Sequence, residues 1–208
     1  MTKRSKTPAP TTPGDAVASA EPVQTVAATS SVDAAPSPPD TEEPLVVGIG
    51  ASAGGLEAYK AFFDKMPTGT NIAFVLVQHL SPDHSSMLVD LISRHTGMQV
   101  QEATDGTHVQ AGHVYVMPPG ATLTIADGVL QLTKPAPPRQ YRWPIDSFFA
   151  SLAEDQGDHA VAIVLSGSGS DGARGLRAVK ERGGLTIAQA GTDHVAMSGM
   201  PASAAATG

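Results

Sequence analysis

A serine set among small residues is the first candidate for chemistry in this sequence. Ser52 lies in the stretch GIGASAGG (48–55), directly after an apolar run. Small neighbours allow a tight turn that exposes the hydroxyl, and the N–H groups at the start of a following helix favour a developing oxyanion. The stretch therefore predicts a nucleophile at Ser52, with Ala53 and Gly54 in the oxyanion and substrate loop. Glycine-rich turns also bind phosphate or simply pack closely, so the turn alone leaves its chemistry open.

Two further residues could complete an acid–base system with Ser52. His79 follows the second apolar run, and an imidazole is the side chain best suited to accept a hydroxyl proton near neutral pH. Asp171 lies in LSGSGSDG after a later apolar run, where it could orient His79 and stabilise the imidazolium. Each also has a simpler interpretation, namely a histidine hydrogen-bonded in a loop and an N-cap for a helix expected from Ala173.

Dinucleotide binding is the main alternative that the glycines raise. The stretch GIGASA (48–53) fits the permissive form of the G-x-G-x-x-G/A fingerprint, and GSGSDG (167–172) fits the strict form. The fingerprint expects an acidic residue about 20 positions on, at the end of the next strand. The next strands here end in VQH (77–79) and QA (189–190), without a carboxylate. This absence disfavours a nucleotide cofactor.

The elements that must position these residues alternate along the chain. Buried strands are expected at 45–49, 72–77, 160–165 and 185–189, and helices at 56–65, 85–95, 145–155 and 173–182. This order predicts an α/β fold with a doubly wound, mostly parallel sheet and helices on both faces. Short β segments at 109–117, 122–125 and 129–132 predict an inserted β-hairpin. Because Ser52, His79 and Asp171 each follow a strand, they should meet at the carboxyl edge of the sheet.

Composition sets the limits of the remaining functions. The chain has 208 residues, no cysteine and a formal net charge of -7, which disfavours thiolate metal sites and general nucleic-acid binding. Asp83 and His84 follow His79 without the spacing of a metal-binding helix or hairpin. No apolar run is long enough to insert into a membrane and no secretory signal is visible, so we expect a cytoplasmic protein. Residues 1–44 are rich in Pro, Ala, Thr and Ser and predict a disordered leader.

Four separated motifs resemble the catalytic domain of chemotaxis protein-glutamate methylesterases. They are VVGIGASAGG (46–55), VQH (77–79), LSGSGSDG (165–172) and GMP (199–201), and they occur in the family's order. The sequences of these motifs are most similar to those of the esterase domain of methylesterase–methyltransferase fusion proteins. The resemblance covers 45–208, which we take as the catalytic domain.

The resemblance implies a reaction and roles for individual residues. It implies hydrolysis of glutamate γ-methyl esters on chemoreceptors, with release of methanol, and deamidation of receptor glutamines, without a metal or organic cofactor. By motif, Ser52 matches the nucleophile, His79 the base and Asp171 the orienting acid. Ser168 matches the position whose backbone N–H lies near the oxyanion. The implied partners are a methylated chemoreceptor and a methyltransferase domain or protein.

The sequence departs from the family pattern in three ways. Ala53 stands where many members have threonine, no receiver domain precedes the motifs, and the chain ends at Gly208, before the expected end of the domain. We therefore expect the domain to lack its C-terminal end and not to be regulated by phosphorylation within this chain. Two functions outside catalysis stay open: the dinucleotide-binding module and a catalytically silent interaction domain.

Overall fold

A computed structural model describes residues 43–78, 87–133, 143–191 and 198–208. The strands are β1 (Leu45–Ala51), β2 (Ile72–Gln78), β3 (Gln99–Glu102), β4 (Thr107–His108), β5 (His113–Val116), β6 (Thr122–Ala126), β7 (Val129–Thr133), β8 (Val161–Val164) and β9 (Leu185–Ala188). The helices are α1 (Gly55–Phe63), α2 (Leu88–Ile92), α3 (Pro144–Gln156), the 3₁₀ turn Gly157–His159, α4 (Ala173–Glu181) and α5 (Gly199–Ala205). The predicted leader lies outside the described residues, apart from Glu43 and Pro44.

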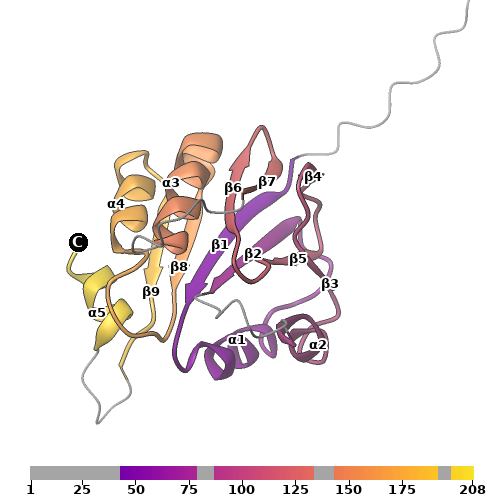
Figure 1. The fold of residues 1–208 in the computed structure, drawn as a ribbon, viewed down its shortest axis with the longest axis horizontal. Coiled ribbons are helices and arrows are strands. Elements are labelled where there is room, and N and C mark those ends of the chain that lie inside the picture. The colour runs from indigo at the N-terminus through magenta and orange to yellow at the C-terminus, as the bar shows by residue number, and fades with distance from the viewer. Residues whose placement is uncertain (1–42, 79–86, 134–142, 192–197) are drawn as a thin grey trace, which may run out of the picture. The chain divides into compact units, whose positions relative to one another are not determined.

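A six-stranded sheet in the order β3-β5-β2-β1-β8-β9 forms the centre of the fold (Figure 1). Every neighbouring pair in it is parallel. From β1 the chain moves outward to β2 on one side, and it later returns to β8 and β9 on the other. The strand order therefore reverses between β1 and β8, which is where ligand sites form in open α/β sheets.

Helices cover both faces of this sheet, as the alternating residues of its central strands require. In β2, Phe74 and Leu76 pack into one apolar cluster with Tyr59 of α1 and Ile92 of α2. Ala73, Val75 and Val77 face the opposite cluster, which α3, α4 and α5 complete. The predicted α/β fold with a mostly parallel sheet is confirmed.

The glycines of β1 let α3 approach the sheet closely. A Cβ atom on Gly48 would lie 3.0 Å from ring atoms of both Phe148 and Phe149, and one on Gly50 would overlap Ile145. Residues 48 and 50 share the β1 face that packs on α3, so any side chain there would push the helix away. Close packing therefore explains the glycines of the first fingerprint without a bound phosphate.

Four elements differ from the sequence-based expectation: β3, β4, β5 and α5. The edge strand β3 was not predicted, because its side chains are mostly exposed and carry no apolar pattern. The expected segment at 109–117 contains the shorter strand β5, and α5 was not predicted either. The predicted hairpin is present as β6 and β7, but β4 joins it in a separate three-stranded antiparallel sheet.

Among the described residues, no helix is both long enough and apolar enough to cross a bilayer.

Candidate active site

Ser52 lies at the point where the strand order reverses. It follows the last residue of β1, is partly exposed, and donates its backbone N–H to the carbonyl of Ser166 at 3.0 Å. Ser166 comes two residues after the end of β8. One backbone hydrogen bond thus joins the two loops that leave the neighbouring strands β1 and β8. The serine occupies the location predicted from the sequence.

The turn after Ser52 has the geometry of a compact strand-to-helix connection. Gly54 adopts a left-handed conformation with φ of 78°, and the N–H of Gly55 returns to the carbonyl of Ser52 at 2.9 Å. The Ser166 hydroxyl donates to the carbonyl of Ala53 at 3.1 Å. The backbone N–H groups of Ala53 and Gly54 form no hydrogen bond within the described part of the chain. They are therefore available donors beside the Ser52 side chain.

A second glycine-rich loop, at 166–172, closes over the serine. A Cβ atom on Gly167 would lie 3.0 Å from Cβ of Ser52 and would overlap the sulfur of Met200, so only glycine fits there. The N–H of Met200, at the start of α5, donates to the carbonyl of Gly167 at 3.0 Å. Ser168 is exposed on this loop, next to Gly167. The GMP motif thus helps to hold the loop that carries Ser168 and Asp171.

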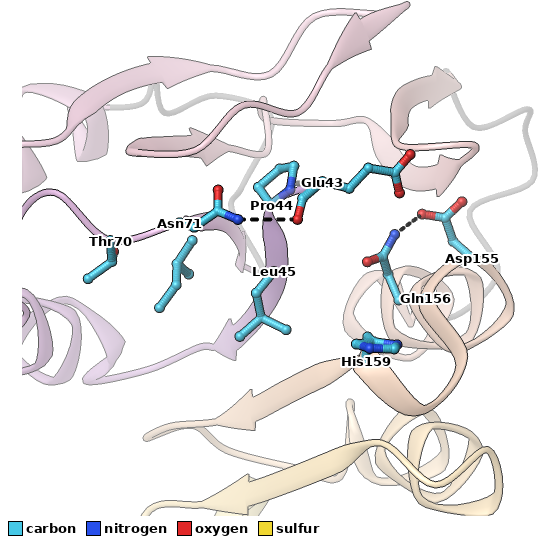
Figure 2. A pocket seen from close by; sticks show the side chains of 9 residues that line it. Glu43, Pro44, Leu45, Thr70, Asn71, Asp155, Gln156 and His159 are labelled. Carbon is cyan, nitrogen blue, oxygen red and sulfur yellow. Dashed lines mark hydrogen bonds between the residues drawn. The ribbon is translucent and has the colours of Figure 1, made fainter. Parts of the chain in front are cut away.

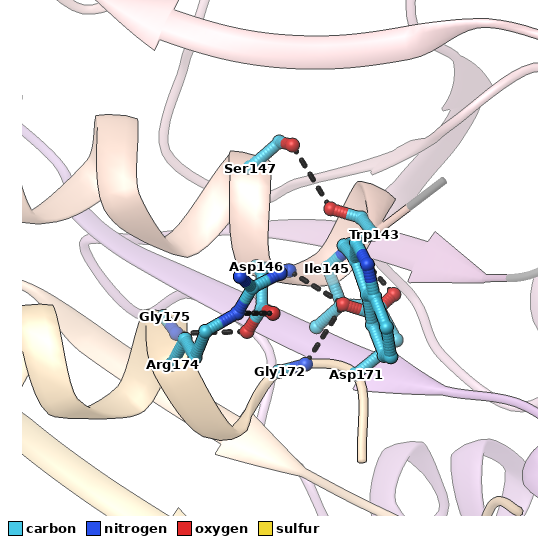
Figure 3. Close-up of polar contacts among 8 residues, drawn as sticks. All are labelled: Trp143, Ile145, Asp146, Ser147, Asp171, Gly172, Arg174 and Gly175. Atoms are coloured by element: carbon cyan, nitrogen blue, oxygen red, sulfur yellow. Dashed lines mark hydrogen bonds and ion pairs between the residues drawn. The ribbon is translucent and has the colours of Figure 1, made fainter. Parts of the chain in front are cut away.

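Asp171 is buried and binds the start of a helix other than the expected one (Figure 3). Its Oδ1 accepts the N–H groups of Asp146 and Gly172, both at 2.9 Å, and its Oδ2 accepts that of Ile145 at 3.1 Å. Ile145 and Asp146 lie in the first turn of α3, whose N-cap residue is Trp143 and supplies no side-chain cap. The predicted N-cap role for the helix starting at Ala173 is wrong, because Gly172 occupies that position and Asp171 caps α3 instead.

Asp146, in turn, caps the start of α4. Its Oδ1 accepts the N–H of Gly175 at 2.8 Å, and its Oδ2 accepts Nε of Arg174 at 3.0 Å. Each of the two helices therefore begins at an N-cap without a capping side chain and is capped by a carboxylate from the other helix's start. Sequence reasoning missed Asp146. Its signal was an acid directly after Pro144-Ile145, in the first turn of a helix.

His79, the predicted base, lies outside the described residues. The last described residue before it, Gln78, pairs in register with Ala51, the residue that precedes Ser52. Asp83 and His84 lie outside the described residues as well. Within the part that is described, no group of three or more His, Cys, Asp or Glu side chains is arranged to hold a metal ion.

A buried tyrosine supports the strands beneath the site. The Tyr59 hydroxyl on α1 lies 3.3 Å from the carbonyl oxygens of both Ile49 and Val77, near the carboxyl ends of β1 and β2. The side chain is fully buried, and desolvation raises the pKa of Tyr59 well above its usual range. The phenol therefore stays neutral and donates a hydrogen bond between the two strands that precede Ser52 and His79.

A cavity lies at the amino ends of β1 and β2, and none of the predicted site residues lines it. It measures about 810 Å³ and is bordered by the first residues of β1 and β2, Leu45 and Ile72, and by the end of α3 (Figure 2). Asn71 Nδ2 donates to the carbonyl of Glu43 at 3.4 Å across its rim. Size alone does not make it the active site, because sites in such sheets form at the carboxyl ends of strands.

Comparison with known proteins decides the family. The family model described as "CheB methylesterase" matches residues 47–208. The chain belongs to the CheB methylesterase family. All the described elements from β1 to α5 overlap this match, and so do the described candidate residues Ser52, Ala53, Gly54, Ser168 and Asp171.

Relatives of this CheB domain have names that describe their activity. A protein-glutamate methylesterase/protein-glutamine glutaminase of Myxococcus xanthus is 37% identical over 171 residues, which are 80% of this chain and 49% of the relative. One from Pseudomonas aeruginosa is 35% identical over 164 residues, covering 74% of this chain and 47% of the relative. The chain thus spans about half the length of the curated relatives it matches.

A solved structure shares the fold. The CheB methylesterase catalytic domain of Thermotoga maritima superposes with a TM-score of 0.68 at 29% identity, covering 77% of this chain and 87% of that one. The α/β architecture found here is therefore that of a CheB catalytic domain.

Proposed function

We propose that this domain hydrolyses glutamate γ-methyl esters on chemoreceptor proteins and releases methanol, using Ser52, His79 and Asp171 as a catalytic triad. Deamidation of receptor glutamines by the same residues is part of the proposal, since the relatives' names pair the two activities. The single observation that supports it is the hydrogen bond from the backbone N–H of Ser52 to the carbonyl of Ser166, because it joins the turn of the serine to the loop that carries Asp171.

The surroundings of Ser52 suit a nucleophile. The neighbouring side chain at 53 is a methyl group and residue 54 is glycine, so a substrate carbonyl can approach without a clash. The N–H groups of Ala53 and Gly54 lie beside the serine, and in the proposal the N–H of Ser168 joins them around the oxyanion. Preorganised backbone donors of this kind are a main source of rate enhancement in acyl transfer.

The proposed reaction has two steps. Ser52 Oγ attacks the ester carbonyl while His79 accepts its proton, and His79 then gives that proton to the departing methoxide, which leaves as methanol and an acyl–Ser52 intermediate. Water next attacks the acyl–Ser52 carbonyl while His79 accepts a proton from it, and His79 returns that proton to Ser52 Oγ as the acyl–oxygen bond breaks and the glutamate carboxylate is released. Asp171 orients His79 in both steps, and its own position is fixed by the α3 N–H groups that it accepts.

The proposed substrate places the domain within a receptor-signalling pathway. Chemoreceptor methylation sites face the cytoplasm, so the domain would act there. A methyltransferase that esterifies the same glutamates would be its functional counterpart, because the two reactions oppose each other on one side chain.

Methanol release from methylated chemoreceptor tests the proposal directly. Wild-type protein should release methanol, and Ser52→Ala should reduce the rate by about 10³-fold or more, because triad members act as a unit. Ser93→Ala is the matched control, since Ser93 is an exposed serine at the end of α2. Equal rates for wild type and Ser52→Ala would refute the assignment of the nucleophile, and no release by folded wild-type protein would refute the activity.

A further inference from the structure

A smaller cavity lies beside the Asp171 loop. It measures about 480 Å³ and lies where the first turns of α3 and α4 meet. Residues that line it include Thr122, Trp143, Asp146, Ser147 and Arg174. Asp171 accepts the N–H of Asp146, which lines the cavity, so the cavity lies next to this member of the candidate triad. Figure 3 shows Trp143, Arg174 and Asp171 grouped around the start of α3.

Arg174 is held in one orientation within this cavity. Its Nε donates to Asp146 Oδ2 at 3.0 Å, and its guanidinium carbon lies 5.2 Å from the centre of the Trp143 ring. The side chain is nevertheless 70% exposed. Its two terminal amino groups form no hydrogen bond within the described part of the chain. Asp146 fixes the Nε edge of the planar guanidinium, and the two terminal amino groups on the opposite edge can donate two parallel hydrogen bonds to a carboxylate.

Asp146 does not bind the two terminal amino groups of Arg174. Asp146 already accepts one hydrogen bond on each oxygen, from Gly175 and from Arg174 Nε. Arg177 follows Arg174 by about one turn and is exposed, so it adds positive charge to the same side of α4. Seven lysines and arginines lie in the described part of the chain, and four of them are in or directly after α4: Arg174, Arg177, Lys180 and Arg182.

We propose that the cavity at Trp143 and Arg174 is a carboxylate-binding subsite, which takes an acidic side chain of the protein substrate close to the scissile ester. The subsite rests on the proposed function and adds a specificity element to it. Arg174 is the specificity-determining residue. Asp146 positions its guanidinium and Trp143 stacks against it.

The substrate's own chemistry supplies such a carboxylate. Each ester hydrolysis on a protein glutamate leaves one carboxylate behind, so a substrate with several esters presents acids beside the remaining ones. This chain has a net charge of -7 and would repel such a segment without a local cation. Arg174 provides that cation at the start of α4, directly after the loop that carries Asp171.

Binding can be measured without catalysis, because Trp143 is the only tryptophan in the chain. We would titrate the protein with two helical peptides in which norleucine replaces the ester. Glutamates flank that position in the acidic peptide, and alanines replace them in the neutral one. The acidic peptide should change Trp143 fluorescence saturably and bind about 10-fold more tightly than the neutral peptide, as expected for a charge-assisted pair.

Variants then assign the difference to Arg174. Arg174→Gln should reduce the preference for the acidic peptide to less than about 2-fold, and Arg174→Lys should restore only part of it, because a lysine lacks the two parallel donors. Arg182→Gln should keep the wild-type preference, since it removes an equal charge after the end of α4. Circular dichroism checks that each variant is folded.

Kinetics on the corresponding ester peptides complete the test. Wild type should have a kcat/KM about 10-fold higher on the acidic ester peptide, mainly through KM, and Arg174→Gln should remove that difference. Equal binding of both peptides by wild type, or an equal loss on both peptides in Arg174→Gln, would overturn the subsite. Charge-dependent binding without any ester hydrolysis would support the subsite and refute the proposed function instead.

Discussion

Replacing Asp171 should destabilise the fold as well as remove activity. Its carboxylate accepts three backbone N–H groups in a site where the residue is only 3% exposed. Asp171→Ala leaves all three donors without this acceptor, at a cost of about 1 kcal/mol each. The favourable interaction of a carboxylate with the start of α3 is also lost, which adds about 0.5 kcal/mol. We therefore expect Asp171→Ala to lower the free energy of unfolding by about 3–4 kcal/mol.

The geometry also predicts how the nearly isosteric variant behaves. In Asp171→Asn, the carbonyl oxygen can still accept from Asp146 and Gly172, which share Oδ1. The new amide group faces the N–H of Ile145, and two donors then oppose each other. Asp171→Asn should therefore lower the free energy of unfolding by about 2 kcal/mol, which is less than the loss expected for Asp171→Ala.

Urea unfolding followed by circular dichroism measures these changes. With an m-value of about 2 kcal/mol per molar, Asp171→Ala should lower the midpoint by about 1.5–2 M and Asp171→Asn by about 1 M. Ser52→Ala is the control, because it should abolish ester hydrolysis while the midpoint moves by less than about 0.3 M. A midpoint for Asp171→Ala within about 0.3 M of wild type would refute the capping role that we assign to this carboxylate.

Three other changes test the packing and electrostatics around the site. Gly50→Ala should cost about 2–3 kcal/mol in urea unfolding, because the added methyl group would overlap Ile145. Asp146→Ala should cost about 1–2 kcal/mol by the same assay, because Gly175 at the start of α4 loses its cap. Because burial raises the pKa of Tyr59, wild-type stability should fall above pH ~10, where the unfolded phenol ionises and the folded one does not. Tyr59→Phe should reduce that fall by up to about 1.4 kcal/mol per pH unit in unfolding titrations from pH ~9 to ~11.5.

A specific outcome would contradict each of these three predictions. An unchanged midpoint in Gly50→Ala would mean that α3 can move away from β1 at little cost. Asp158→Ala is the matched control for Asp146→Ala, since Asp158 is exposed and forms an ion pair with its exposed neighbour His159. Equal effects of these two variants would exclude the capping role of Asp146. Parallel stability curves for wild type and Tyr59→Phe at high pH would contradict a neutral buried phenol.

The sequence by itself determined the type of fold and the identity of most candidate residues. Apolar runs such as 72–77 predict buried strands because both faces of a parallel sheet are covered, and this local signal depends on few distant contacts. Glycine-rich stretches after two of the strands marked the loops in which Ser52 and Asp171 lie. The motifs around them resembled one family, which the comparison with known proteins confirmed.

Only the tertiary structure decided what the glycines and acids contact. Gly48 and Gly50 fit part of a nucleotide fingerprint, yet they pack directly against Phe148 and Ile145 of α3. Asp171 looked like a cap for the helix that follows it, but it caps α3, about 25 residues earlier in the chain. A cap formed between two helices depends on how those helices pack, and no local sequence pattern encodes that packing. The oriented Arg174 beside Trp143 emerged for the same reason, since it depends on Asp146 from the other helix.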